Sequence, residues 1–212
     1  MENPWLSPWL SIPLEEYEGH MALPEIGQAQ MLAGKLEFAV RRYSPKSIAI
    51  VGCAGGNGLD RLVGSGIERI VGIDINPAYV EMVSRRFRSR ISGLELHVAD
   101  IQSALPQITS VDLVFAALIL EYVDVAMTMR SLQTLCAPDG ALVVILQAGG
   151  QNVEKTSPSP YKSIQLLAPA MRLLGVDDVK QQAVAAVFSL ASSRVVNLRS
   201  GKDFVILRFG KD

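Results

Sequence analysis

Short apolar runs alternate with amphipathic stretches along most of the chain. The runs are rich in Val, Ile and Leu and show no polar alternation, which is typical of buried parallel strands. They are SIAIVG, RIVGIDI, LELHVAD, VDLVFAAL and GALVVILQ, all between residues 47 and 147. Two intervening segments, PAYVEMVSRRFRSRI and VDVAMTMRSLQTLCAP, have the spacing of amphipathic helices. This order predicts βαβ units and a doubly wound α/β sheet.

The end of the chain has a different pattern. SRVVNLRSGKDFVILRFGKD holds two β-prone runs around RSGK, which predicts a hairpin. An antiparallel pair would then close a mostly parallel, seven-stranded sheet. Before it, SIQLLAPAMRLLG looks helical although it contains Pro169, and VDDVKQQAVAAVFSLAS fits either a helix or a strand.

The first 44 residues are interpreted as an N-terminal lid and helical extension, ahead of a main domain at 45–212. Both tryptophans and four prolines lie within the first 24 residues, and the prolines oppose a long helix there. A short helix through Glu15–His20 is compatible with the pattern. Residues 25–42 have helical spacing and precede the helix-ending pair Ser44-Pro45.

Composition and charge narrow the classes of function. Hydrophobic residues make up 49% of the chain and charged residues 19%, and this hydrophobic fraction is enough for a large core. A net charge of -1 gives no electrostatic argument for nucleic acid or a membrane surface. The two cysteines and two histidines lack metal-ligand spacing, so we expect no metal. Without a recognisable leader or apolar span, we expect a cytoplasmic protein, and one that could form a homodimer.

The stretch IAIVGCAGGNGLD, residues 48–60, joins the first apolar run to a glycine-rich loop. In an open α/β sheet, ligands bind beyond the carboxyl ends of the strands, and glycines let the backbone approach them closely. A triphosphate loop would end in GK[ST], whereas Gly58 is followed by Leu59. A dinucleotide loop would have glycines where Ala54 and Asn57 stand. The loop therefore fits a nucleoside without phosphates better, with the helix expected after it offering its positive end.

Two aspartates end the second and third predicted strands. Asp74 lies 74 − 52 = 22 residues after Gly52, the usual distance for a carboxylate that accepts hydrogen bonds from ribose hydroxyls. Asp100 ends HVAD at the next strand tip, where a carboxylate can accept from an adenine amino group. Either aspartate could instead cap a helix, although Asn76 before Pro77 fits a cap better than Asp74 does.

Five segments follow one another as the signature motifs of a known family do. They are IAIVGCAGGNGL, VGIDINPAYV, HVADI, VDLVFAALILEYV and CAPDGALVVIL. Over residues 47–146 the chain resembles the class I S-adenosylmethionine-dependent methyltransferases, and its terminal hairpin is similar to that family's last two strands. The start of the chain looks like the lid of members that act on small molecules. The resemblance implies a Rossmann-like fold, S-adenosylmethionine as cofactor, and methyl transfer to a small-molecule acceptor.

The resemblance also implies which residues hold the cofactor. The glycine-rich loop would line its methionine and ribose end, and two alanines after the fourth strand would lie near the methionine. Asp74 would hold the ribose, with Ile75 packing on an adenine that Asp100 and Ile101 flank. The full expected set is Gly52, Cys53, Ala54, Gly56, Asp74, Ile75, Asp100, Ile101, Ala116 and Ala117.

Two positions depart from the family's pattern. Ile50 stands where the family usually has an acidic residue, and Ala54 replaces the middle glycine. We expect the first change to weaken the hold on the cofactor's amino group and the second to crowd the turn. A non-catalytic protein that binds the cofactor therefore stays an alternative. A nicotinamide-dependent oxidoreductase is a further one, disfavoured by the loop pattern, Asp100 and the hairpin.

Methyl transfer needs mainly alignment and exclusion of water, and a base only where the acceptor loses a proton. His20 is the candidate base, because it lies in the segment expected to fold over the cofactor. Tyr17 could close over the methionine end, and Glu121 follows the fourth strand, where many family members present substrate-facing groups. Each residue also has an ordinary interpretation: a surface histidine, a packing aromatic and a helix start.

Overall fold

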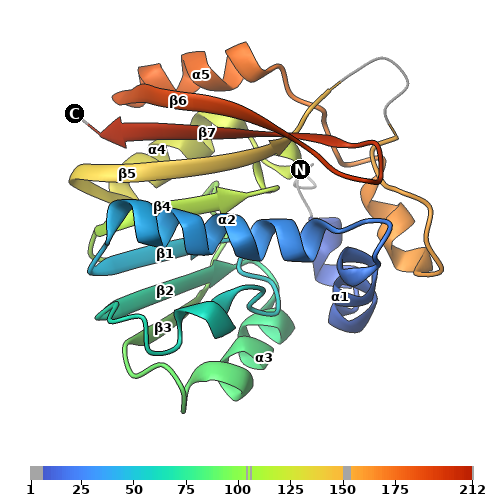
Figure 1. The fold of residues 1–212 in the computed structure, drawn as a ribbon, viewed down its shortest axis with the longest axis horizontal. Coiled ribbons are helices and arrows are strands. Elements are labelled where there is room, and N and C mark those ends of the chain that lie inside the picture. Colours follow the sequence, from blue (N-terminus) through green and yellow to red (C-terminus); the bar gives the residue numbers. More distant parts are fainter. Residues whose placement is uncertain (1–6, 104, 106, 150–153, 212) are drawn as a thin grey trace.

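A seven-stranded sheet forms the centre of the computed structural model, which describes residues 7–103, 105, 107–149 and 154–211. The strand order is β3-β2-β1-β4-β5-β7-β6 (Figure 1). The first five strands run parallel, and β7 is antiparallel to both β5 and β6. The strands are β1 Ser47–Val51, β2 Arg69–Asp74, β3 Leu94–Val98, β4 Val111–Ala117, β5 Cys136–Gln147, β6 Phe188–Asn197 and β7 Asp203–Lys211. The predicted doubly wound sheet and terminal hairpin are confirmed.

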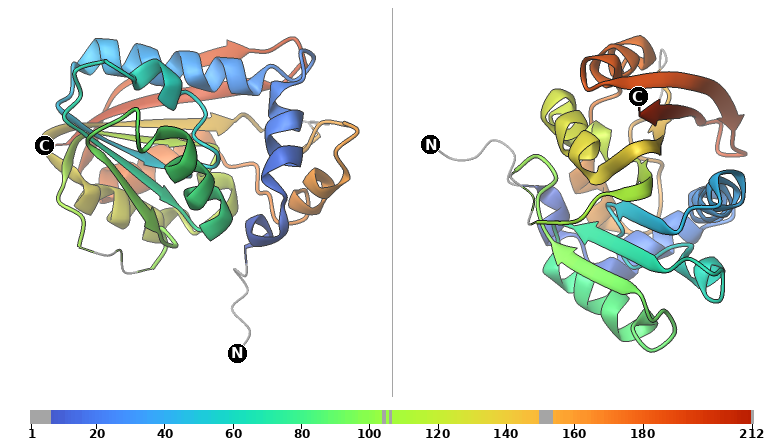
Figure 2. Two further views of the ribbon diagram at one scale, coloured as in Figure 1. Left: turned by 90° about the horizontal axis from the view of Figure 1, so that it is seen from below. Right: turned by 90° about the vertical axis from the view of Figure 1, so that its left-hand side faces the viewer.

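Helices cover both faces of the sheet (Figure 2). Helices α2 and α3 pack on one face, and α4 and α5 pack on the other. Short 3₁₀ helices and α1 lie in the connections. The helices are η1 Pro8–Ser11, α1 Leu14–Ala22, α2 Gln28–Tyr43, η2 Leu59–Leu62, α3 Pro77–Phe87, η3 Leu120–Tyr122, α4 Val125–Leu135, η4 Lys162–Leu167 and α5 Val176–Ala185.

Alternate residues of the central strands enter two separate hydrophobic cores. In β1, Ile48 and Ile50 pack on the side of α2, whereas Ala49 and Val51 pack on the side of α4. Because both faces are covered, these strands are apolar throughout, which explains the unbroken runs in the sequence. The parallel strands end at one edge, and β1 pairs with both β2 and β4, so the chain leaves β1 at the switch in strand order.

The connection from β1 to β2 differs from the expectation. Instead of a full helix after the glycine-rich loop, the chain forms the four-residue 3₁₀ helix η2. Gly58, Gly64 and Gly66 have φ values of +86°, +73° and +80°, and these left-handed conformations bound the helical segment on both sides. The segment around Pro169 also forms only the 3₁₀ helix η4, and the ambiguous run after it divides into α5 and β6.

Candidate functional site

The glycine-rich loop turns sharply at the carboxyl end of β1. Gly52 has a φ of +72°, and its N–H donates to the Ile73 carbonyl oxygen at 2.8 Å. The Cys53 N–H donates to the same oxygen at 3.1 Å, which ties the loop to β2. Ala54 has a φ of +44°, a left-handed conformation that disfavours a residue with a Cβ atom. The expected crowding at Ala54 thus takes the form of an unfavourable backbone conformation.

Asp74 holds this loop from the end of β2. Its Oδ2 accepts from the Ala54 N–H at 2.8 Å, and its Oδ1 accepts from the Asn76 N–H at 2.9 Å. Burial raises the pKa of the Asp74 carboxyl, and the backbone donors oppose that rise. Asn76, as the sequence favours, caps α3 by accepting from the Ala78 N–H. Asp74 is therefore a ligand candidate that also shapes the loop.

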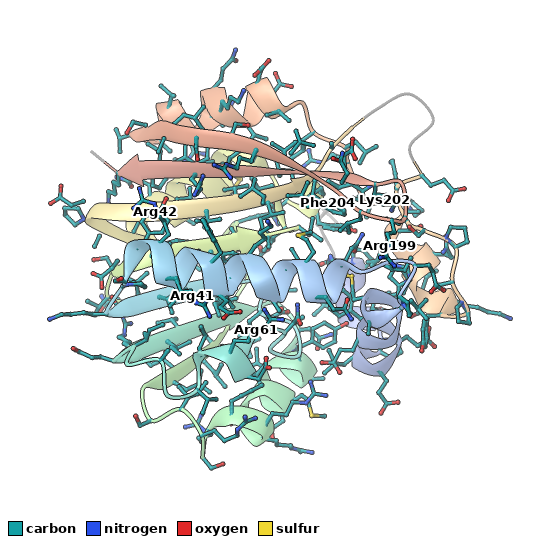
Figure 3. All side chains as sticks on the ribbon, in the orientation of Figure 1. Arg41, Arg42, Arg61, Arg199, Lys202 and Phe204 are labelled. Carbon is teal, nitrogen blue, oxygen red and sulfur yellow. The ribbon has the colours of Figure 1, made fainter. Side chains whose placement is uncertain are left out.

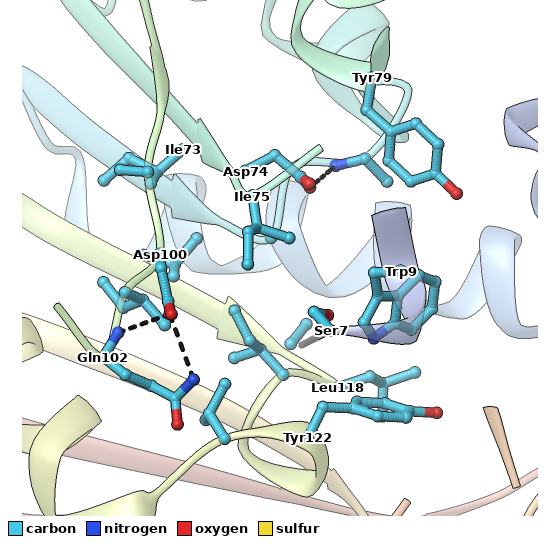
Figure 4. A pocket seen from close by; sticks show the side chains of 18 of the residues that line it. Ser7, Trp9, Ile73, Asp74, Ile75, Tyr79, Asp100, Gln102, Leu118 and Tyr122 are labelled. Carbon is cyan, nitrogen blue, oxygen red and sulfur yellow. Dashed lines mark hydrogen bonds between the residues drawn. The ribbon is translucent and has the colours of Figure 1, made fainter. Parts of the chain in front are cut away.

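A hollow of about 700 Å³ lies beside the loop at the strand ends (Figure 4). Asp74 and Asp100 both line it. Asp100 Oδ1 accepts from the Gln102 backbone N–H at 3.0 Å and from its side-chain Nε2 at 3.2 Å, as the dashed lines in Figure 4 show. Two carboxylates from adjacent strand tips thus face one space. Gln102 thereby fixes the orientation of Asp100, a role that no separate pattern in the sequence indicates.

Most of the expected cofactor-binding residues meet at this hollow. Seven line it: Gly52, Ala54, Asp74, Ile75, Asp100, Ile101 and Ala117. The other three, Cys53, Gly56 and Ala116, are buried in the adjoining walls and do not line it. Burial raises the pKa of the Cys53 thiol, so this side chain stays a neutral packing group. The binding roles of all ten residues stay predictions.

Aromatic side chains from the start of the chain cover the hollow. The Trp9 ring lies edge-on to Tyr17 and to Tyr122, with centroid distances of 5.3 and 5.1 Å. Tyr17 stacks on Tyr79 at 6.4 Å. The Tyr79 hydroxyl donates to the Ile12 carbonyl oxygen at 2.8 Å, which fastens the covering segment to α3. We call residues 7–22, containing η1 and α1, the lid segment.

An ion pair fastens the lid segment to the glycine-rich loop as well. The guanidinium of Arg86 on α3 pairs with the Glu18 carboxylate on α1, and its Nη1 also donates to the Gly55 carbonyl oxygen at 2.9 Å. Both charged side chains are partly exposed, so the pair itself contributes little to stability. Its consequence is positional, since α1 is held directly over the loop.

A second hollow of about 490 Å³ adjoins the first. The two share one wall, formed by Trp9, Tyr17, Leu118 and Tyr122. His20 lines the second hollow, and its buried Nδ1 has no hydrogen-bond partner among the described residues. Burial, followed by the positive charge of Lys202, lowers the pKa of His20. The imidazole is therefore neutral near pH 7 and able to accept a proton.

Glu121 has a different environment from the other two catalytic candidates. It is fully buried and lines neither hollow. Its Oε1 accepts from the Gln147 backbone N–H at 2.7 Å, joining η3 to the end of β5. Burial raises the pKa of Glu121 to about 7. Tyr17, in contrast, lines both hollows. The catalytic role of each of the three candidates stays a prediction.

A comparison with models of protein families finds a match for the central part of the chain. Residues 50–144, from β1 to β5, match the family model described as a methyltransferase domain. The chain contains a methyltransferase domain. The matched range begins within β1 and includes the glycine-rich loop and both aspartates. A search of the curated proteins finds no match to the chain.

Solved structures with the same fold include methyltransferases of small molecules. Magnesium protoporphyrin IX methyltransferase from Synechocystis PCC 6803, with bound SAH, has a TM-score of 0.71 at 14% identity, covering 93% of this chain and 94% of that one. The N-methyltransferase NodS from Bradyrhizobium japonicum WM9, in complex with S-adenosyl-L-homocysteine, has a TM-score of 0.66 at 16% identity, covering 93% and 97%. The methyltransferase domain thus has the class I, Rossmann-like fold.

The same fold also occurs in a protein of different activity. The [4+2]-cyclase SpnF has a TM-score of 0.66 at 14% identity, covering 84% of this chain and 81% of that one. The architecture of the methyltransferase domain therefore does not by itself establish methyl transfer. Within the described residues, no helix is long and apolar enough to cross a membrane. The same residues contain no cluster of three or more His, Cys, Asp or Glu side chains that could hold a metal ion.

Proposed function

We propose that this protein is an S-adenosylmethionine-dependent methyltransferase that acts on a small-molecule acceptor. The observation that carries the proposal is the first hollow, where Asp74 and Asp100 face one space beside the glycine-rich loop. Two hydrogen-bond acceptors at neighbouring strand tips suit a nucleoside without phosphates, because each carboxylate would repel a phosphate group. The match of residues 50–144 to the methyltransferase domain supports the same conclusion.

The residues present fit this cofactor. Asp74 would accept from the ribose hydroxyls, Ile75 would pack on the adenine, and Asp100 would accept from its amino group. At Gly52, an added Cβ would lie 3.3 Å from Ile119 Cδ1, so the absence of a side chain keeps the turn open where the methionine end would lie. Ile50 is buried in the core facing α2, which leaves no carboxylate at that position for the cofactor's amino group.

When bound, S-adenosylmethionine would supply a methyl group activated by its sulfonium sulfur. The chain would contribute alignment and exclusion of water, chiefly through the aromatic wall and the lid segment. His20 would accept a proton at Nδ1 where the acceptor must lose one. Tyr17 would close over the cofactor's methionine end. Glu121, which reaches neither hollow, would act by fixing η3 against β5 rather than by touching the acceptor.

The second hollow is the proposed place of the acceptor. It lies directly across the aromatic wall from the first hollow, and its lining combines hydrophobic side chains with a few polar groups, as small-molecule sites do. The net charge of -1 gives no electrostatic argument for a nucleic acid or a membrane surface, so the acceptor we propose is a small molecule. We also propose that the protein works in the cytoplasm.

Thermal unfolding with added ligand tests the proposed cofactor. A ligand that binds only the native state raises the midpoint of unfolding, so S-adenosylhomocysteine should stabilise the protein and NAD should not. Stabilisation by NAD alone would identify an oxidoreductase and overturn the proposal.

A second measurement separates an enzyme from a non-catalytic binder, the alternative raised by Ile50 and Ala54. Incubation with S-adenosylmethionine carrying a radiolabelled methyl group, across a panel of metabolites, should label at least one small molecule. Binding of S-adenosylhomocysteine with no labelled product from a broad panel would favour the binder.

A further inference from the structure

Lys202 places a positive charge inside the second hollow. The residue directly precedes β7, at the end of the sheet that faces α1 and η4 (Figure 3), and only 6% of its surface is exposed. Its Nζ donates to the Lys155 carbonyl oxygen at 2.9 Å and to Gln147 Oε1 at 3.3 Å. Both partners are neutral groups. Among the described residues, no carboxylate forms an ion pair with this ammonium.

A buried ammonium with only neutral partners is unusual, because a lysine is rarely buried without an opposite charge. Burial lowers the pKa of Lys202 to about 8, and the exposed carboxylate of Glu154 opposes that change. The side chain therefore still carries its proton near pH 7. An ammonium has three N–H donors, and the two hydrogen bonds to the chain leave one for a ligand.

The rest of the second hollow has the character of a site for a mainly apolar molecule. Its lining includes the hydrophobic side chains of Met21, Leu118, Ile164, Leu167 and Met171. Polar residues also line it, and the aromatic wall is shared with the first hollow; the polar residues are His20, Gln28, Gln147, Lys155, Thr156 and Lys202. A ligand that fills this space thus contacts both the buried ammonium of Lys202 and the wall that borders the proposed cofactor site.

We propose that the second hollow takes an anionic methyl acceptor: a small, mainly apolar molecule whose carboxylate pairs with Lys202 and whose reacting atom lies at the aromatic wall. The inference deepens the proposed function and rests on it, because the word acceptor presumes a methyl donor in the first hollow. An incoming carboxylate would supply the opposite charge that the ammonium lacks. It would also orient the molecule, since its apolar part would pack on hydrophobic residues such as Met21, Ile164 and Leu167.

Matched pairs of ligands test this assignment. With saturating S-adenosylhomocysteine present, the protein is titrated calorimetrically with a panel of aryl and alkyl carboxylates and with the primary carboxamide of each. 3,4-Dihydroxybenzoate and 3,4-dihydroxybenzamide form one such pair. The carboxylate of the best pair should bind at least about tenfold more tightly, because hydrogen bonds to charged groups are stronger than neutral ones. Equal affinity within every pair, or no binding by any carboxylate, would overturn the inference.

Two substitutions locate the effect. Lys202→Met should abolish the preference for the carboxylate, and Lys202→Gln should do the same with a polar side chain. Lys180→Met, which removes a half-buried lysine of α5 that pairs with Asp177 and lines neither hollow, should leave the preference intact. Retention of the preference in both Lys202 variants would contradict the inference. The affinity for S-adenosylhomocysteine is measured first, because it reports whether each variant is folded and whether the first hollow is intact. If the wild-type protein did not bind S-adenosylhomocysteine, that result would instead count against the proposed function.

Discussion

At the scale of single residues, the loop at the end of β1 contains one conformation that its side chain disfavours. Ala54 has a φ of +44°, yet its N–H donates to Asp74 and its side chain borders the first hollow. A left-handed conformation costs a residue with a Cβ atom roughly 1–2 kcal/mol. The hydrogen bond from the Ala54 N–H to Asp74 holds the loop in this conformation, so the unfavourable conformation lowers the free energy of unfolding.

Ala54→Gly should therefore stabilise the protein. Relief of the left-handed conformation outweighs the added freedom of glycine in the unfolded chain, so the free energy of unfolding should rise by about 0.5–1 kcal/mol. Denaturation by urea measures it. The same substitution inside a helix, Ala39→Gly in α2, provides the control and should lower stability by about 1 kcal/mol. A loss of stability in Ala54→Gly would contradict this account of the loop.

Glu121 predicts a pH dependence of stability. Its pKa is about 7 in the folded state against 4.5 for the free group, so the folded protein prefers the protonated acid. The stabilising contribution is complete below pH 4.5 and is lost as pH rises through 7. Glu121→Gln cannot ionise and keeps an oxygen for the Gln147 N–H. Compared with wild type, it should therefore gain stability between pH 5 and pH 8, by up to about 3 kcal/mol.

Urea denaturation of both proteins at the two pH values measures this gain. The pH-dependent difference is the informative quantity, because any constant effect of the amide cancels. A difference between variant and wild type that is the same at both pH values would show that Glu121 ionises freely in the fold.

At the scale of elements, the lid segment and α2 pack in different places although both lie in the predicted extension of residues 1–44. Helix α2 belongs to the core of the sheet, with Leu36 and Ala39 buried against it. The lid segment instead spans the strand ends, and α1 lies beside η4, where Glu16 accepts from the Ser163 N–H at 2.9 Å (Figure 2). Trp9 and Tyr17 of the lid segment line the first hollow, so this segment is the element expected to move when a ligand enters.

Hydrogen exchange tests that opening. Amides of α1 should exchange more slowly once S-adenosylhomocysteine is bound, because a ligand beneath Trp9 and Tyr17 favours the closed position. Helix α5, which packs on β6 away from both hollows, is the internal control and should not change. Exchange in α1 that is indifferent to the ligand would show that the lid segment does not cover the cofactor.

At the scale of the whole molecule, the sheet could be predicted from the sequence because each strand carries its own local signal. Both Asp74 and Asp100 follow buried runs, and their meeting at one hollow follows from parallel strands ending at one edge. The sequence pattern places Lys202 only in the turn of the predicted hairpin. Its place beside His20 depends on β7 pairing with β5, which no local pattern encodes. The shortened first crossover was likewise missed, since glycine spacing does not reveal which φ values become positive.

The fold gathers the two hollows from segments that are far apart in the chain. The first combines the loops after β1, β2, β3 and β4 with the lid segment, and the second combines the lid segment with η4 and the hairpin. The central claim is that the first hollow binds a phosphate-free nucleoside with a sulfur-bearing arm. Asp74 is its most specific element, because it faces the hollow and also shapes the loop.

Calorimetric titration of S-adenosylhomocysteine into wild-type protein and Asp74→Ala tests the claim most directly. Asp177→Ala, which removes an exposed carboxylate from α5, is the matched control. We predict one bound ligand per chain and at least about tenfold weaker binding in Asp74→Ala, for loss of charge-assisted hydrogen bonds, with Asp177→Ala unchanged. No binding by the wild-type protein, or an unchanged affinity in Asp74→Ala, would contradict the account.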